Sequence, residues 1–321
     1  MRSFKERLAD TVFTSGFVLI HLSTLLAIWA GASWFAVGIC VAMYYLRMFG
    51  ITAGYHRYFS HRTFRTSRFF QFVLAFTGSM ALQKGPLWWA AHHRHHHRFS
   101  DTEDDVHSPI TGTLWWSHVG WIFSEKSKET RWKLIPDLTK FPELAWLERY
   151  HLVAPLTLAV AMFALGTLLE SVAPGLGTNG FQLVVWGFLI STVLLWHGTF
   201  TINSLSHRIG RRRFDTPDHS RNNWFLAIIT MGEGWHNNHH RYLASERQGF
   251  YWWEIDTAHY VLKALSLLGI VSDLRTPPES IYREAIEGRV ASRTQRRLQR
   301  SARDKRAIGQ KRVRQEVEVG E

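Results

Sequence analysis

The sequence predicts an all-α integral membrane protein, and three observations support this fold class. First, four stretches of about 20 residues each contain at most one charged residue, and at about 1.5 Å per residue each can cross the roughly 30 Å hydrocarbon core of a bilayer. Second, the stretches form two pairs with short, uncharged connections. Third, basic residues gather outside the pairs. One large membrane domain, residues 1–287, is therefore expected.

The predicted transmembrane helices follow the chain in order. The first pair is joined by "GAS" and the second by "VAPGLGTNG". The spans cover about residues 11–31, 34–54, 152–172 and 181–202. A cleavable signal peptide could mimic the first span, but this stretch is too long for a typical signal core and lacks a clear small-residue cleavage site.

The distribution of basic residues predicts the orientation. Arg2, Lys5 and Arg7 precede the first span, and the segments 56–68 and 208–213 follow the second and fourth spans. The positive-inside rule then places both termini and the large middle segment in the cytoplasm, with the cell inner membrane as the expected location. Arg47 lies near the cytoplasmic end of its span, where an interfacial anchor that snorkels to the headgroups is expected.

Two segments outside the spans have distinct compositions. Residues 69–82, "FFQFVLAFTGSMAL", are too few to span comfortably and predict a helix in the interface or beneath the cytoplasmic portion. Residues 288–321 form a basic tail. Nucleic-acid binding is not expected of a membrane protein's tail; anionic lipid headgroups, an acidic electron carrier or plain solvation each fit it.

Cysteine usage and one glycine motif exclude several kinds of site. Cys40 is the single cysteine, so no internal disulfide, iron–sulfur cluster or thiolate zinc site can form. "GLGTNG" at 175–180 fits the dinucleotide-binding pattern, but it joins two membrane spans instead of a strand and a helix. Any metal must therefore be held by nitrogen or oxygen.

Histidines supply the nitrogen, and they recur in four segments on the predicted cytoplasmic side. "GYHRYFSH" follows the second span, and "NSLSH" ends the fourth. "HRHHH" and "HNNHH" both contain His-x-x-His-His, whose i, i+3, i+4 spacing places three imidazoles on one helical face. The candidate ligands are His56, His61, His93, His96, His97, His207, His236, His239 and His240.

Nine imidazoles exceed the needs of one ion and suit two ions with four or five nitrogens each. A closed structural zinc site would be complete with four ligands. Imidazole serves zinc, copper, iron and nickel alike, so ligand type leaves the metal open. A solvated histidine patch is the alternative for one run, although two copies 143 residues apart in the chain argue against chance. His92 and His95 are interpreted as bystanders near the surface.

At these motifs the chain resembles the membrane fatty acid desaturases, and among them the acyl-CoA Δ9 desaturases of the stearoyl type. The resemblance covers roughly residues 15–280 and includes "GITAGYHRYFSHRTF", "HHRHHHRFSDTEDDVHSP", "SHVGW", "NSLSHRIGRRRFDT" and "GEGWHNNHHRY" in order. It implies a non-haem diiron site, built by the nine histidines on a cytoplasmic helical cap, that uses dioxygen and two electrons to desaturate an acyl chain. Asn203 would hold a metal-linked water, and Trp89 and Thr199 would lie beside the bend of the bound chain.

The resemblance also implies partners. The chain shows no haem-attachment or iron–sulfur motif, so a separate donor is expected: a ferredoxin, a rubredoxin-like protein or a haem protein with its reductase. Ala91 and His92 stand where the animal enzymes have an Arg-Asp pair that helps to hold CoA, so acyl-CoA ranks only narrowly ahead of acyl carrier protein or acyl-lipid. Hydroxylation by the same type of centre, and metal handling without catalysis, are the alternative functions.

Overall fold

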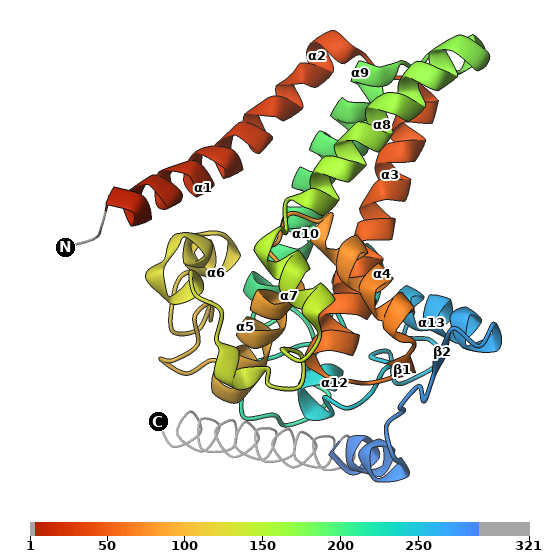
Figure 1. Ribbon diagram of the computed structural model, residues 1–321. Coiled ribbons are helices and arrows are strands. Elements are labelled where there is room, and N and C mark those ends of the chain that lie inside the picture. Colours follow the sequence, from red (N-terminus) through yellow and green to blue (C-terminus); the bar gives the residue numbers. More distant parts are fainter. Residues whose placement is uncertain (1–3, 289–321) are drawn as a thin grey trace, which may run out of the picture.

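A computed structural model describes residues 4–288, and within them the regular secondary structure is almost entirely helical. Figure 1 shows long helices on one side of the molecule and a cap of shorter helices on the other, with α1 inclined away from the remaining long helices. The long helices and the turns between them are made of the following elements, in chain order: α1 (Phe4–Ser23), η1 (Thr24–Leu26), α2 (Ala27–Ala30), α3 (Trp34–Phe49), the π-helix η2 (Gly50–Ser60), α8 (Val153–Val172), η6 (Pro174–Leu176), α9 (Gly180–Leu183), the π-helix η7 (Val184–Ile190) and α10 (Ser191–Ser204).

The helical cap comprises the elements between η2 and α8 and those after α10. Its only strands among the described residues are β1 (Arg65–Thr66) and β2 (Val271–Ser272), which pair antiparallel. Its helices are α4 (Arg68–Ser79), α5 (Pro86–Phe99), α6 (Leu114–His118), η3 (Gly120–Phe123), η4 (Glu125–Ser127), η5 (Trp132–Leu134), α7 (Pro142–Arg149), α11 (Trp224–Ile229), α12 (His236–Arg241) and α13 (Thr257–Leu267).

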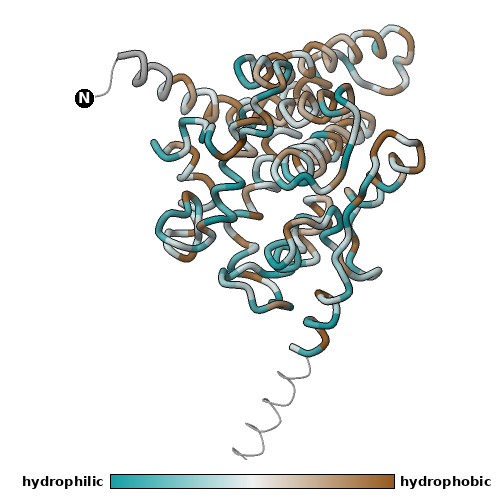
Figure 2. Tube along the Cα trace, turned by 60° about the horizontal axis from the view of Figure 1, so that its bottom comes forward, coloured by the Kyte–Doolittle hydropathy of each residue, from teal (hydrophilic) through white to brown (hydrophobic). Residues whose placement is uncertain are grey.

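Four helices are long and apolar enough to cross a membrane: Thr11–Ala30, Trp34–Ser60, Val153–Val172 and Gly180–Ser204. In Figure 2 hydrophobic residues follow these helices, and hydrophilic residues concentrate in the connecting segments of the cap. The predicted fold class is confirmed. The second helix is longer than the predicted 34–54 because it continues through η2, which carries it out of the apolar stretch into the first histidine segment.

Two features of the fold concern α4 and Arg47. Helix α4 (Arg68–Ser79) covers most of the predicted 69–82 segment and begins one residue before it, and it packs so closely on η2 that a Cβ on Gly50 would lie 2.6 Å from Gly78 N. The prediction of an interfacial anchor for Arg47 is wrong. Its side chain is fully buried and donates to Ser191 Oγ and Thr192 Oγ1, each at 2.6 Å, because the facing turn of α10 supplies two hydroxyl groups. The basic tail, apart from Gly288, lies outside the described residues.

Candidate metal centre and cavity

Helix α5 carries the second histidine segment, and it is fixed at both ends. Its N-terminus follows Gly85 and begins with Pro86, and Glu148 Oε2 accepts hydrogen bonds from the free N–H groups of Leu87 and Trp88 at 3.0 and 3.1 Å. Near its C-terminal half, Arg94 donates to Asp137 and to the carbonyls of η2. These bonds hold α5 against the π-helix that carries the first segment.

Helix α12 carries the last histidine segment, and the two asparagines between its histidines anchor it. Asn237 Oδ1 accepts from the backbone N–H groups of Arg213 and Phe214 at 2.7 and 2.8 Å. Asn238 Nδ2 donates to Gln248 O at 2.9 Å. Both asparagines are fully buried. The amides thus bind the surrounding loops and leave the imidazoles of the same short helix free to reach inward.

The nine candidate histidines form two clusters. Within each cluster one ligand atom per residue lies within 4.8 Å of every other. The five-histidine cluster contains His56, His61, His93, His97 and His239. The four-histidine cluster contains His96, His207, His236 and His240.

Imidazole Nε2 atoms converge inside each cluster. In the five-histidine cluster the Nε2 atoms of His61 and His93 are 2.8 Å apart, and those of His93 and His97 are 2.9 Å apart. His239 Nε2 lies 2.9 Å from His97 Nε2. In the four-histidine cluster His207 Nε2 and His236 Nε2 are 3.0 Å apart. Each cluster therefore points several imidazole nitrogens at a common centre.

Each His-x-x-His-His motif divides between the two clusters. In α5, His93 and His97 join the five-histidine cluster, and His96 joins the other. In α12 the assignment is reversed, since His239 joins the five-histidine cluster while His236 and His240 join the four-histidine cluster. The i, i+4 pair of each helix thus serves one cluster, and the remaining histidine serves the other.

Carboxylates hold the outer nitrogens of several cluster histidines. His207 Nδ1 donates to Asp101 Oδ2 at 2.8 Å, and His240 Nδ1 donates to Asp218 Oδ2 at 2.6 Å. His96 Nδ1 lies 3.1 Å from Asp105 Oδ2. His56 Nδ1 contacts Glu233. A carboxylate on Nδ1 fixes the tautomer and leaves the Nε2 lone pair for a metal.

The acidic residues near the clusters differ in whether the sequence could show which of them contact a histidine. Of the acidic residues beside the second motif, Asp101 and Asp105 contact cluster histidines, whereas Glu103 and Asp104 are exposed. Asp218 was not predicted, because it lies in the loop after "RRRF" at no fixed spacing from any histidine. A search for carboxylates close in sequence to His207 would have found Asp218 only among several equivalent candidates.

Electrostatics keeps most cluster imidazoles neutral. Burial, and then the charge of neighbouring imidazoles, holds the pKa of His61, His93 and His97 well below the usual range, and His236 and His239 behave alike. Burial lowers the pKa of His240 to about 4, although Asp218 opposes the shift. Burial opposes protonation of His96 too, but Asp105 and two other carboxylates raise its pKa. Neutral imidazole is the form that binds metals.

The residues present fit a pair of metal ions. Each cluster presents at least four nitrogen ligands without a thiolate, which suits first-row transition metals. Among the described residues, the buried atoms His236 Nδ1, His239 Nδ1 and His240 Nε2 have no hydrogen-bond partner. Close approach of several Nε2 lone pairs, with few donors to satisfy them, is the arrangement that a bound cation would stabilise.

The two bystander histidines of α5 join neither cluster, but their predicted surface location is wrong. His92 is 3% exposed and stacks on Trp88 with ring centroids 4.2 Å apart. His95 is 9% exposed and lies 4.7 Å from the Phe99 ring. Both are buried by tertiary packing: His92 lies in the wall of an apolar cavity, and His95 packs against Phe99.

An apolar cavity of about 540 Å³ adjoins both clusters. His56 and His93 of the five-histidine cluster and His96 and His236 of the four-histidine cluster line it. Side chains of α1, including Phe13 and Phe17, form part of its wall. A cavity of this size and polarity can hold an extended hydrocarbon chain beside both groups of imidazoles.

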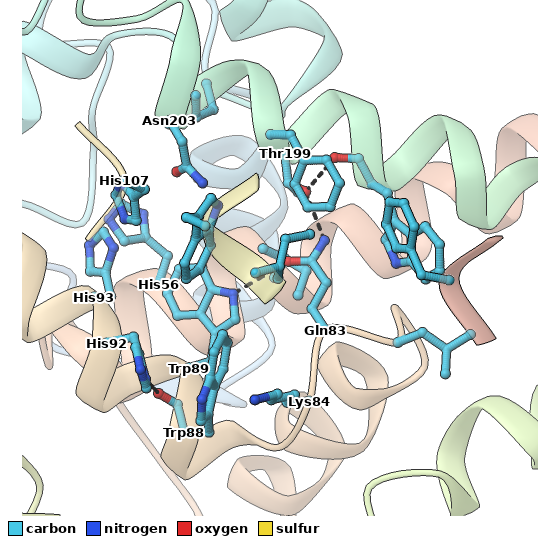
Figure 3. A pocket seen from close by; sticks show the side chains of 18 of the residues that line it. His56, Gln83, Lys84, Trp88, Trp89, His92, His93, His107, Thr199 and Asn203 are labelled. Carbon is cyan, nitrogen blue, oxygen red and sulfur yellow. Dashed lines mark hydrogen bonds between the residues drawn. The ribbon is translucent and has the colours of Figure 1, made fainter. Parts of the chain in front are cut away.

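Figure 3 shows the predicted substrate residues in this cavity. Gln83 bridges them: its Nε2 donates to Thr199 Oγ1 at 2.7 Å, and its Oε1 accepts from Trp89 Nε1 at 3.4 Å. Trp89 also stacks on His93, with ring centroids 5.0 Å apart. Asn203 lies in the same wall, as Figure 3 shows. Gln83 was not predicted, because nothing in its local sequence distinguishes it.

Comparison with known proteins identifies relatives across most of the chain. The sequence model of the fatty acid desaturase family matches residues 32–270. An acyl-CoA 5-desaturase of Anemone leveillei is 39% identical over 251 residues, which are 77% of this chain and 74% of that protein. An sn-2 palmitoyl-lipid 9-desaturase of Nostoc sp. is 37% identical over 82% of this chain and 89% of its own length. An sn-1 stearoyl-lipid 9-desaturase of Synechocystis sp. is 36% identical, with coverages of 82% and 80%. With two clusters of imidazoles beside an apolar cavity and relatives of this kind, the chain belongs to the fatty acid desaturase family and is an oxidoreductase.

Proposed function

We propose that the protein introduces a cis double bond, at or near the ninth carbon, into a saturated fatty acyl chain. The reaction joins the acyl chain, dioxygen, two electrons and two protons, and it yields the unsaturated chain and two molecules of water. Two C–H bonds on neighbouring carbons break and a second C–C bond forms. The relatives named as 9-desaturases support this position, although others are named 5-desaturases.

The observation that carries the proposal is the cavity wall shared by the two histidine clusters. His56, His93, His96 and His236 line one apolar cavity, and they come from both clusters. A saturated carbon has no acidic proton and no leaving group, so acid–base side chains cannot begin the reaction. The reaction therefore needs a cofactor beside the acyl chain, and the two histidine clusters in this wall are candidate sites for one.

We further propose that the cofactor is a pair of iron ions, one in each cluster. Bound iron would activate dioxygen and supply the hydrogen abstraction that no side chain can supply. The protein itself would orient the ligands. Three histidines of the four-histidine cluster donate hydrogen bonds from Nδ1 to the carboxylates of Asp101, Asp105 and Asp218. That cluster has one ligand fewer, and Asn203 in the nearby wall is proposed to hold a metal-linked water there.

The bend of the bound chain is assigned to Trp89 and Thr199. Gln83 connects their side chains by hydrogen bonds and so stiffens this part of the wall. Because Trp89 stacks on His93, its position is tied to the five-histidine cluster. A rigid wall at a fixed distance from the metals selects which two carbons react.

Partners and location complete the proposal. The acyl carrier is CoA or a membrane lipid, both of which occur among the relatives' names. Electrons come from a separate ferredoxin, rubredoxin-like protein or haem protein. The clusters of basic residues at the cap-side ends of the spans support an inner-membrane protein whose termini and cap face the cytoplasm.

Expression in cells that lack unsaturated fatty acids, followed by double-bond mapping of their lipids, tests the proposal. Monounsaturated chains of one defined position should appear with the wild type and be absent with His96→Ala, and the purified wild type should contain two irons. Hydroxylated chains instead of unsaturated ones would establish the alternative reaction. Metal binding without any acyl product would overturn catalysis altogether.

A further inference from the structure

The first membrane span, made of α1, η1 and α2, forms one side of the cavity yet packs loosely on the other spans. None of its most apolar stretch is fully buried, whereas 56% of the corresponding stretch of the fourth span is. Figure 1 shows α1 inclined away from the remaining long helices. One face of α1 nonetheless lines the cavity, with Val12, Phe13, Gly16, Phe17 and Ile20. On this side, a single loosely packed helix therefore lies between the cavity and the hydrocarbon of the bilayer.

The end of this span nearest α3 is fixed, and a weak point lies beside it. Gln182 Nε2 donates to Ala30 O at 3.0 Å, and Trp186 Nε1 donates to the next carbonyl at 2.8 Å. Between this anchor and the part that lines the cavity, the 3₁₀ turn η1 interrupts the helix. Here Ser23 Oγ and Thr24 Oγ1 donate to carbonyls three residues earlier, each at 2.7 Å. Because 3₁₀ turns within a helix are common hinges, α1 can pivot at η1.

A chain of three histidines joins α1 to α10 and α6. His21 Nδ1 donates to Phe17 O at 2.8 Å, so in a neutral ring His21 Nε2 is an acceptor, and His197 Nε2 donates to it at 3.2 Å. His197 Nδ1 then accepts from His118 Nε2 at 3.0 Å. At the far end, Ser204 Oγ lies 2.9 Å from His118 Nδ1. The three-histidine chain lies outside the cavity wall and outside both histidine clusters.

This chain is the part of the contact that resists separation within a bilayer. Phe17 of α1 stacks on Trp196 of α10 at 5.0 Å between ring centroids, but lipid tails can replace such apolar contacts when the helices part. Lipid tails cannot replace a hydrogen bond, so parting His21 from His197 leaves both imidazoles without that partner in an apolar medium. One hydrogen bond between membrane helices is still weak enough to break and form again in each turnover.

We propose that the first span is a gate that pivots at η1 and is latched by the three-histidine chain, and that the acyl chain of a bilayer lipid passes between α1 and α10. This inference rests on the proposed desaturase function, in which a saturated chain enters and an unsaturated chain leaves in every turnover. An acyl chain that is still attached to its lipid stays in the leaflet, so a sideways opening admits it without extracting the lipid. Closure returns Phe13 and Phe17 to the cavity wall and encloses the chain during the reaction.

The first test locks the gate with a reversible crosslink. His21→Cys and His197→Cys are combined in a Cys40→Ala background and joined by a short bis-methanethiosulfonate. In proteoliposomes, turnover of stearoyl-oleoyl-phosphatidylglycerol should fall by more than about ten-fold, with iron unchanged, and should recover when the crosslink is reduced. The matched control joins Ser33→Cys to Gln182→Cys at the fixed end of the span, where Ser33 Oγ donates to Gln182 Oε1 at 2.8 Å. Its turnover should be the same with and without the crosslink.

Loading the lipid before locking separates an effect on passage from an effect on chemistry. A protein crosslinked with the lipid already bound should form about one double bond and should keep the product until the crosslink is reduced. Continued turnover by the locked protein, or failure to form even the first double bond, would overturn the gate. A wild type that turns over stearoyl-CoA but never the bilayer lipid would overturn it too. A wild type that forms no double bond in either substrate would instead refute the proposed function.

The second test weakens the latch without a crosslink. His21→Leu leaves His197 without its acceptor, so the gate should open more readily. Radiolabelled stearoyl-oleoyl-phosphatidylglycerol is loaded without an electron donor and chased with excess unlabelled lipid. It should dissociate about three- to ten-fold faster than from the wild type, with iron unchanged. His21→Gln keeps an acceptor oxygen and should restore the wild-type rate. Equal dissociation from His21→Leu and the wild type would remove the three-histidine chain from the gate.

Discussion

The two histidine clusters differ in how their imidazoles are held. In the four-histidine cluster, carboxylates contact the Nδ1 atoms of His96, His207 and His240. In the five-histidine cluster, His56 has such a contact, with Glu233, and the other four members bring their Nε2 atoms together without one that the structure records. The four-histidine cluster thus has fewer members, most of which are held by carboxylates from outside, whereas the five-histidine cluster has more members, most of which contact only one another.

This difference indicates a division of labour. A five-nitrogen set would enclose a bound metal, whereas a four-nitrogen set would leave room for an exchangeable ligand, in keeping with the place of Asn203 in the cavity wall. Carboxylates raise the basicity of the imidazoles they contact, which would compensate for the missing ligand. The predictions below test whether the clusters depend on these different supports.

The largest effect is expected from removing a ligand. Alanine at His96 leaves three nitrogens in one cluster, and alanine at His93 or His97 leaves four in the other. Each variant, and equally His207→Ala, should lower desaturation by more than about 100-fold, beyond the range for residues that only orient ligands. Bound iron, measured by elemental analysis, should fall as well. If His93→Ala keeps both irons and half its activity, the five-histidine cluster is not a metal site.

A smaller loss is expected when an orienting carboxylate is removed. Asp218→Asn removes the negative charge from the group that accepts the hydrogen bond of His240 Nδ1. Iron affinity or activity should therefore fall by about 10- to 100-fold. Asp215→Asn, three residues away on the exposed surface, is the matched control and should change neither. Chelator competition measures the affinity. Equal behaviour of the two variants would contradict the carboxylate's role.

The sequence predicted which histidines gather better than it predicted their hydrogen-bond partners, for a physical reason. Membrane spans and His-x-x-His-His motifs are local patterns, because the bilayer demands long apolar runs and a helix places i, i+3 and i+4 residues together. The exchange of clusters between α5 and α12 depends on how two helices far apart in the chain face each other. Asp218 and the buried Arg47 likewise found partners only through tertiary packing. No local spacing encodes such contacts.

Product position is expected to change with the cavity wall while both clusters remain intact. Thr199→Val keeps the side-chain shape but removes the hydroxyl that accepts a hydrogen bond from Gln83. Gln83 should then hold the Trp89 ring less firmly through its other hydrogen bond. Trp89→Leu should have the larger effect because its ring stacks on His93. We expect rates lower by about three- to ten-fold and displaced double bonds. Mass spectrometry of the products tests this, and iron loss with an unchanged product would contradict the assignment.

The smallest effect is expected at His95, which lies one residue from His96 on α5. Adjacent helical positions are rotated by about 100°, so His95 cannot reach the cluster that His96 joins. Its ring packs near Phe99, and it belongs to neither histidine cluster. His95→Ala should keep both irons and most activity, with a loss of stability of about 1 kcal/mol from the lost packing. Thermal melting in detergent and elemental analysis of the same preparation check both expectations. A His95→Ala protein that melts normally but loses iron as completely as His96→Ala would show that α5 presents a different face to the metals.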